Sequence, residues 1–171
     1  RAAATDTHAD MDRLIKVMET HMPADDGQRT LVHGDYRIDN MIFAKDGTQC
    51  VAVLDWELST TGRPFADLAG VLMQWRLPAD AMGRGLDGID RAAHGLPSDE
   101  ECVAACAQRR GQEVDHLGFY VAFCFFRRAS IVQGVYRRAL DGNASTPEAG
   151  LKLGSLIPLF AEKGLSALET V

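Results

Sequence analysis

The sequence predicts an α+β fold that is mostly helical and carries a small β hairpin in the early part of the chain. Two observations support this prediction. Short apolar runs suited to strands flank an Asp46-Gly47 turn in the first third of the chain. Beyond them, apolar residues recur at helical spacing in several segments that glycine or proline separates. The strands are therefore expected early and most of the helices after them.

The first elements follow from the local residue pattern. Apolar residues at helical spacing predict a helix over 7–22. Branched residues predict a buried strand at Thr30–Val32, and two further strands at 40–43 and 50–54 are joined around the Asp-Gly turn. The last of these strands ends on Asp55.

The middle of the chain predicts two helices on either side of an irregular segment. Apolar residues over 65–75 have helical spacing, whereas 76–97 contain two prolines and four glycines and predict a long irregular excursion. Ser98 and Glu101 have the capping-box pattern, in which the side chain of each accepts a hydrogen bond from the backbone N–H of the other. A helix is therefore expected over 99–110.

The last part of the chain predicts two more helices. Asp115 can cap a long helix that runs through Leu140 and ends at Gly142. Thr146 followed by Pro147 predicts the start of one final helix, because proline fits the first helical position. The apolar face of this helix consists of Leu153, Leu156, Ile157, Phe160 and Leu168.

Length, charge and hydropathy limit the class of protein. At 171 residues the chain is about one domain long, so we expect a single domain over 1–171. A formal net charge of -6 argues against a dedicated nucleic-acid-binding protein. No apolar run approaches the roughly 20 residues that span a bilayer, and the start lacks the apolar core of a signal peptide. We therefore expect a soluble cytoplasmic protein that binds neither nucleic acid nor membrane.

Cysteine spacing argues against a metal centre or a disulfide framework. The sequence has no CxxC pair, and two of its cysteines lie four residues apart in a helix-like stretch. We expect buried free thiols at all four cysteines, which are Cys50, Cys102, Cys106 and Cys124.

The segment that carries chemistry is His33-Gly34-Asp35, with Asn40 five residues after the aspartate and Asp55 beyond the hairpin. A carboxylate can orient an attacking hydroxyl and accept its proton, while an amide oxygen and a second carboxylate are hard ligands for Mg²⁺. Taken singly, Asp35 fits a turn and Asn40 fits an Asx cap. Their joint occurrence with Asp55 and an intervening hairpin favours a phosphoryl-transfer site.

This segment resembles the signature of the aminoglycoside phosphotransferase and choline kinase family, enzymes with a protein-kinase-like fold. That signature is HGD, four residues and Asn, then a strand that ends in an aspartate. Stretches 31–40 and 51–60, together with 125–129 and 133–136, are most similar to the kinase-like domain fused to some animal acyl-CoA dehydrogenases. The resemblance covers nearly the whole chain from Met11 onward, and it implies the C-terminal, mostly helical lobe of that fold.

The resemblance also implies a role for each residue of the motif. Asp35 is the implied catalytic base, and His33 is the implied organiser of the catalytic loop. Asn40 and Asp55 are the implied ligands of Mg²⁺ and would hold the ion on the phosphates of ATP, the phosphoryl donor. Asp67 matches an aspartate that hydrogen-bonds the backbone of the catalytic loop from the start of a helix, as a structural support.

Other residues near the motif have two interpretations each. Arg37 could act in catalysis by binding an anionic substrate group or the transferred phosphoryl, or it could form a structural ion pair. Glu57 would share a face with Asp55 on a strand and could be a further metal ligand, or it could be a plain surface charge. We expect Trp56 and Trp75 to pack in the core.

The sequence lacks parts that such a kinase needs before its catalytic loop. These parts are a glycine-rich turn over the nucleotide phosphates and a lysine paired with a helix glutamate. The residues before His33 include one lysine, Lys16, and no glycine-rich turn. We therefore expect that the N-terminal nucleotide lobe is absent from this chain and that the isolated lobe is inactive.

Together these observations predict a phosphotransferase that moves the γ-phosphoryl of ATP to the hydroxyl of a small molecule, with Mg²⁺ as cofactor. The subgroup resemblance points to a hydroxyacyl acceptor, such as an acyl-CoA-like compound. Arginines of the long helix could guide such an anion, although a solvated helix face is the favoured interpretation for them. These arginines are Arg127, Arg128, Arg137 and Arg138.

Alternatives to this function stay open at the level of sequence. One is a non-catalytic kinase-like lobe that binds a ligand or partner without phosphoryl transfer. Another is a metal-dependent hydrolase built on His33, Asp35, Asn40 and Asp55. The surface left by the missing lobe could also form a homodimer, because large apolar patches rarely stay bare.

Overall fold

The structure, a computed structural model, describes residues 8–79 and 85–169. The chain divides into two compact units. One, which we call the helical unit, consists of Arg1–Pro23 and Gly118–Val171, and the other, the hairpin unit, consists of Ala24–Leu117. Within the described ranges, no helix is long and apolar enough to cross a membrane.

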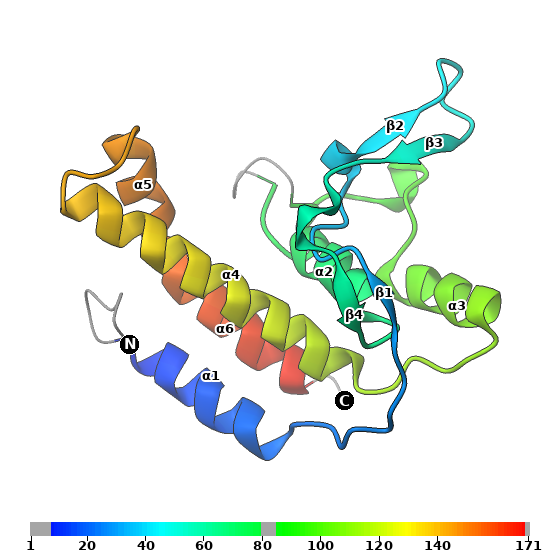
Figure 1. Cartoon of the computed structure of the whole chain (residues 1–171), viewed down its shortest axis with the longest axis horizontal. Coiled ribbons are helices and arrows are strands. Elements are labelled where there is room, and N and C mark those ends of the chain that lie inside the picture. Colours follow the sequence, from blue (N-terminus) through cyan, green and yellow to red (C-terminus); the bar gives the residue numbers. More distant parts are fainter. Residues whose placement is uncertain (1–7, 80–84, 170–171) are drawn as a thin grey trace. The chain divides into compact units, whose positions relative to one another are not determined.

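The helical unit is built, in its described part, from α1 (Ala9–Thr20), α4 (Leu117–Leu140), α5 (Pro147–Gly154) and α6 (Ile157–Glu169). Helix α1 packs along α6 (Figure 1). Leu14, Phe125 and Phe160 are fully buried in this unit, and burial of a large apolar side chain stabilises a fold by about 1.5–3 kcal/mol. Gly164 permits the close packing, because a Cβ at that position would lie 2.8 Å from a Leu14 methyl carbon.

The structure contradicts the single final helix that the sequence predicts. Helix α5 begins at Pro147, as expected, but it ends at Gly154, and α6 begins at Ile157. Pro158 explains the break, because proline has no N–H to donate and its ring would clash with the carbonyl of Gly154 in a continuous helix. The apolar residues assigned to one face therefore belong to two separate helices.

Helix α4 ends as predicted and begins later than predicted. It ends at Leu140, shortly before Gly142, whose φ of 73° is the left-handed conformation of a helix terminator. At its start, His116 directly precedes the helix with a φ of 55°, and Asp115 lies one residue further back. Asp115 is therefore not at the capping position that the sequence suggests.

The hairpin unit contains, in its described part, two antiparallel two-stranded sheets: β1 (Thr30–Val32) with β4 (Thr60–Gly62), and β2 (Met41–Phe43) with β3 (Cys50–Val53). The β2–β3 hairpin around the Asp-Gly turn is confirmed (Figure 1), and its register pairs Met41 with Val53. In the other sheet, Val32 pairs with Thr60. Strand β4 was not predicted, because its Thr-Thr-Gly sequence has no apolar alternation.

Strand β1 is less buried than the sequence suggests. Val32 is buried, but the side chain of Leu31 is 63% exposed. Successive side chains of a strand point to opposite faces, so Leu31 turns away from the face on which Val32 is buried. The short strand nevertheless delivers His33 at its end, as predicted.

Two helices of the hairpin unit agree with the sequence: α2 (Ala66–Trp75) and α3 (Asp99–Arg110). The capping box of α3 is present, with the Glu101 N–H donating to Ser98 Oγ and the Ser98 N–H donating to Glu101 Oε2. Gly111 ends the helix with a φ of 64°. The described part of the unit also has three short 3-10 turns: η1 (Ile38–Asn40), η2 (Trp56–Leu58) and η3 (Ala92–His94).

The described part of the 76–97 excursion is irregular apart from η3 and a single bridge between Pro78 and Asp87, whereas residues 80–84 lie outside the described residues. The cysteines are all free, as predicted, but the expected burial holds only for Cys124. Cys102 and Cys106 are partly buried on α3, and Cys50 is exposed because it begins a strand of the hairpin.

Candidate active site

The loop that follows β1, residues 33–40, has as its second residue a glycine whose conformation no other residue would adopt easily. Gly34 has a φ of 85°, in the left-handed region that glycine occupies without steric cost. A Cβ on Gly34 would lie 2.6 Å from the carbonyl oxygen of Leu58, so the η2 turn presses against the loop at this point. Backbone conformation and close packing therefore both require glycine here.

Asp67, in the first turn of α2, binds the start of this loop. Its Oδ2 accepts the backbone N–H of His33 at 2.7 Å, and its Oδ1 accepts the backbone N–H of Gly34 at 2.9 Å. Hydrogen bonds to an ionised carboxylate are among the stronger ones in proteins. The side chain thus fixes the loop to α2, which is the contact that the resemblance implied for Asp67.

His33 connects the loop to the end of β3. The imidazole is 2% exposed, and its Nε2 lies 2.8 Å from the carbonyl oxygen of Leu54. A carbonyl can only accept, so Nε2 carries the proton, and Nδ1 is then the acceptor for the Asp35 backbone N–H at 3.3 Å. A single neutral tautomer of His33 therefore joins the Asp35 backbone to the residue before Asp55.

Asp35 and Asn40 are brought together by the loop. The Asn40 Nδ2 donates to the backbone carbonyl of Asp35 at 2.9 Å and to its Oδ2 at 3.1 Å. Asn40 is 7% exposed, so the amide is a buried polar group whose donors are satisfied by Asp35 alone. The two residues that the sequence places in one site do lie in contact.

Arg37 lies against the same carboxylate. Its Nε is 3.0 Å from Asp35 Oδ2, within ion-pair distance, but the N–H does not point along a hydrogen bond to that oxygen. The Nε is therefore a buried donor without a hydrogen-bond partner among the described residues, which is unusual for a native protein.

Tyr36 follows Asp35 and turns its ring edge towards His33, with ring centroids 6.0 Å apart. Burial raises the pKa of the Tyr36 phenol, and interactions with Cys50, Asp67 and Cys106 raise it further. The phenol therefore stays protonated and neutral at physiological pH.

Asp55 is placed beside the loop by the backbone of Leu54. The Leu54 N–H donates to the carbonyl of Asn40 at 2.8 Å, while its carbonyl accepts from His33. Asp55 itself adopts a left-handed conformation with a φ of 64°, which is uncommon for a residue other than glycine. The hairpin thus returns Asp55 to the neighbourhood of Asn40, as the sequence predicts.

The donor set of Asn40 and Asp55 fits Mg²⁺. The Asn40 Nδ2 is engaged by Asp35, so the Asn40 Oδ1 is the atom left to act as a ligand. The Asp55 side chain is exposed and makes no hydrogen bond or ion pair within the described residues. A carboxylate and an amide oxygen are the hard ligands that Mg²⁺ prefers, with water and phosphate oxygens completing its shell.

Two expectations near Asp55 are wrong. Glu57 does not lie on a strand, because Trp56–Leu58 forms the η2 turn, so the argument that Glu57 shares a strand face with Asp55 fails. Trp56 is not in the core, since its side chain is 44% exposed. Trp75 is partly buried on α2, and the Arg91 guanidinium lies over its ring at 5.5 Å.

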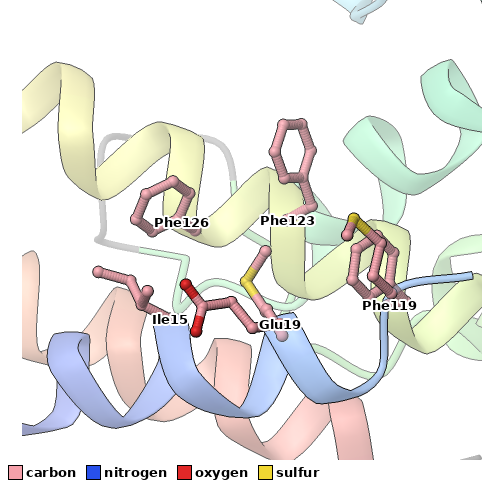
Figure 2. A pocket seen from close by; sticks show the side chains of 7 residues that line it. Ile15, Glu19, Phe119, Phe123 and Phe126 are labelled. Atoms are coloured by element: carbon pink, nitrogen blue, oxygen red, sulfur yellow. The ribbon is translucent and has the colours of Figure 1, made fainter.

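A pocket in the helical unit is chemically different from this site. It measures about 190 Å³ and lies between α1 and α4, lined mainly by apolar side chains that include Ile15, Phe119, Phe123 and Phe126 (Figure 2). Glu19 is the one charged residue in its lining. This mainly apolar lining does not combine a base with metal ligands, as phosphoryl transfer requires. The candidate site is therefore the 33–40 loop together with Asp55.

Comparison with known proteins shows which family the chain belongs to. A model of the phosphotransferase enzyme family matches residues 1–106. The chain is 44% identical over 164 residues to acyl-CoA dehydrogenase family member 10 of Mus musculus, in a match that covers 95% of this chain and 15% of that protein. It is 40% identical over 168 residues to acyl-CoA dehydrogenase family member 11 of Gallus gallus, covering 96% of this chain and 21% of that protein. The chain therefore spans about a fifth or less of the length of these relatives.

A solved structure resembles the whole of the described fold. It is the crystal structure of a Ralstonia eutropha protein assigned as an aminoglycoside phosphotransferase, which is 36% identical to this chain with a TM-score of 0.90. The match covers 99% of this chain and 51% of that one. The mostly helical, kinase-like fold and the resemblance to the acyl-CoA dehydrogenase subgroup are thus confirmed. Because the family model covers more than half of its residues, the chain belongs to the phosphotransferase enzyme family.

Proposed function

We propose that this chain supplies the catalytic loop of an ATP-dependent phosphotransferase, which moves the γ-phosphoryl of ATP to the hydroxyl of a small organic acceptor. The observation that carries the proposal is the contact between Asn40 and Asp35, with Asp55 tied to the same pair through the Leu54 backbone. A base and two metal ligands within one small region are the parts that phosphoryl transfer requires of a protein.

Asp35 is the proposed catalytic base. As the acceptor oxygen forms its bond to the γ-phosphorus, the bond from that phosphorus to the leaving oxygen of ADP breaks, and the hydroxyl proton passes to Asp35. Asp35 Oδ2 is held by Asn40 and lies beside Arg37. Oδ1 accepts no hydrogen bond within the described part of the chain, so it is the oxygen available to the acceptor hydroxyl.

Asn40 and Asp55 would hold Mg²⁺, which when bound neutralises charge on the phosphates of the nucleotide. The hydrogen bond from the Asn40 amide nitrogen to Asp35 Oδ2 fixes the orientation of the Asn40 side chain. The amide oxygen of Asn40 therefore faces away from the base. Arg37 would bind an anionic group, either on the acceptor or on the phosphoryl in transfer, while its Nε stays beside the Asp35 carboxylate.

For the acceptor we propose a hydroxyacyl compound of the acyl-CoA type. The support is the similarity of nearly the whole chain to acyl-CoA dehydrogenase family members 10 and 11. A non-catalytic binding lobe is the alternative, and it would bind ligands without consuming ATP.

A screen of the full-length protein separates these possibilities. Hydroxylated acyl compounds, their coenzyme A thioesters and an aminoglycoside are each incubated with Mg²⁺ and ATP, and ADP release is measured. We expect ADP release that depends on a hydroxyacyl compound and that stops when the same compound without its hydroxyl is supplied. Release of ADP with an aminoglycoside alone would contradict the acceptor class, and binding of ATP without release under any acceptor would favour the non-catalytic alternative.

A further inference from the structure

Asp55 is held in its left-handed conformation by the residue that follows it. With φ 64° and ψ 55°, Asp55 needs support from its surroundings, because this conformation is strained for a residue with a Cβ. The Trp56 Nε1–H donates to the carbonyl oxygen of Val53 at 2.8 Å. This bond spans Asp55, because it joins the side chain of Trp56, which follows Asp55, to the backbone of Val53, two residues before Asp55.

The η2 turn supports the same geometry from the far side. The Ser59 N–H donates to the Trp56 carbonyl at 2.9 Å, which closes the turn directly after the indole. Leu58, inside the turn, lies against Gly34 of the loop. Trp56 is therefore fixed at its backbone by the turn and at its side chain by the bond to Val53, and this second bond spans Asp55.

Trp56 also contacts the side of the site that carries the base. Its ring lies against the His33 imidazole, with centroids 4.6 Å apart and an interplanar angle of 52°. Because the indole is 44% exposed, burial of apolar area accounts for only part of what a tryptophan contributes at this position. What tryptophan supplies at this position and phenylalanine would lack is an N–H donor.

We propose that Trp56 is a positioning residue for phosphoryl transfer, whose indole N–H holds Asp55 in the orientation that a metal ligand requires. The proposal rests on the proposed function, in which Asp55 binds Mg²⁺. Partners of metal ligands usually change metal affinity or activity by about 10-fold to 100-fold when they are removed. Loss of the indole N–H should therefore weaken metal binding although every ligand remains.

The test uses Trp56→Phe, which removes the N–H and keeps an aromatic ring beside His33, in the full-length protein. Trp75→Phe is the matched control, because it makes the same change at the other tryptophan, whose ring lies under Arg91 on α2. Binding of Mn²⁺, as a spectroscopic substitute for Mg²⁺, is measured by electron paramagnetic resonance, and kcat and KM are measured with the acceptor found by the screen. In the NMR spectrum of the metal-free protein, the indole N–H signal that Trp56→Phe removes should exchange with solvent more slowly than the signal that Trp75→Phe removes.

We expect Trp56→Phe to weaken Mn²⁺ binding by about 10-fold or more and to lower kcat with little change in acceptor KM, while Trp75→Phe changes neither. Equal Mn²⁺ affinity in the two variants, or a rapidly exchanging Trp56 indole N–H, would overturn the positioning role. The variant Asp55→Asn distinguishes failure of the positioning role from failure of the proposed function. Asparagine tolerates the left-handed conformation but lacks the charge of a metal-binding carboxylate. If Asp55→Asn keeps full Mn²⁺ affinity and turnover, the proposed function itself is wrong.

Discussion

The side-chain amide of Asn40 donates to both the backbone carbonyl and the carboxylate of Asp35, at 2.9 and 3.1 Å. Two residues five positions apart therefore form one unit, in which the amide nitrogen orients the proposed base and the amide oxygen is left for a cation. This arrangement explains why a neutral amide, with a donor and an acceptor on one group, suits the position better than a carboxylate.

Replacing the Asn40 amide should disturb both the orientation of the Asp35 base and the binding of the metal ion. Asn40→Ala removes the donor to Asp35 and the oxygen proposed for the metal, so we expect Mn²⁺ affinity and kcat each to fall by about 10-fold or more. Asn143→Ala, at an exposed asparagine after α4, is the control. Isothermal titration with Mn²⁺ and steady-state kinetics measure the two quantities, and an unchanged Mn²⁺ affinity in Asn40→Ala would remove Asn40 from the metal site.

Asp67 should contribute to stability as well as to activity. In Asp67→Ala the N–H groups of His33 and Gly34 lose their acceptor in a partly buried place, and each unsatisfied group costs about 1–3 kcal/mol. The free energy of unfolding should fall by about 2–4 kcal/mol, measured by urea denaturation. Asp10→Ala on the exposed side of α1 should change it little. A loss below about 0.5 kcal/mol would mean that the loop does not depend on these bonds.

Gly34 and Gly47 form a pair that separates backbone strain from steric clash. Both have positive φ, 85° and 70°, but a Cβ on Gly34 would meet the Leu58 carbonyl at 2.6 Å, whereas a Cβ on Gly47 would meet nothing within 4 Å. Gly47→Ala should cost about 1–2 kcal/mol of stability from strain alone. Gly34→Ala should cost more and should also abolish turnover. Equal losses of stability in the two variants would show that the η2 turn yields to the added methyl.

The thiols should differ in their reaction with an alkylating reagent. Burial raises the pKa of Cys102, and the neighbouring Cys106 raises it further. The thiolate is the form that reacts, and a raised pKa lowers its fraction at a given pH. Alkylation of Cys102 should therefore require a higher pH than alkylation of an ordinary cysteine. Cys50 is exposed and should react first with iodoacetamide in the native protein. Peptide mass spectrometry over a pH series measures the order, and earlier labelling of Cys102 would contradict it.

Local signals of the sequence predict most of the fold. The capping box places the start of α3 and Gly111 places its end, and the Asp-Gly turn places the β2–β3 hairpin. Both signals act over a few residues, so they do not depend on the rest of the chain. The break between α5 and α6 also has a local cause in Pro158, which the apolar periodicity across it concealed.

Features set by distant contacts were not predicted. Strand β4 exists because it pairs with β1, thirty residues earlier, and its own sequence has no strand pattern. The motif brought Asp35, Asn40 and Asp55 together correctly, because spacing and an intervening hairpin determine their proximity. The places of Trp56 and Glu57 depend instead on the turn that follows the left-handed Asp55, and sequence periodicity contains no signal for such a turn.

The central claim is that Asp35 is the base of a phosphoryl transfer, and its most direct test is kcat of Asp35→Asn in the full-length protein with the acceptor found by the screen. Asparagine keeps the size of the side chain but cannot take the hydroxyl proton. We predict that kcat falls by about 10²–10⁴-fold while Mg²⁺-ATP binding stays within a few-fold of that of the unchanged protein. Asp46→Asn, in the exposed hairpin turn, should leave kcat unchanged. Turnover by Asp35→Asn at the rate of the unchanged protein would contradict the claim.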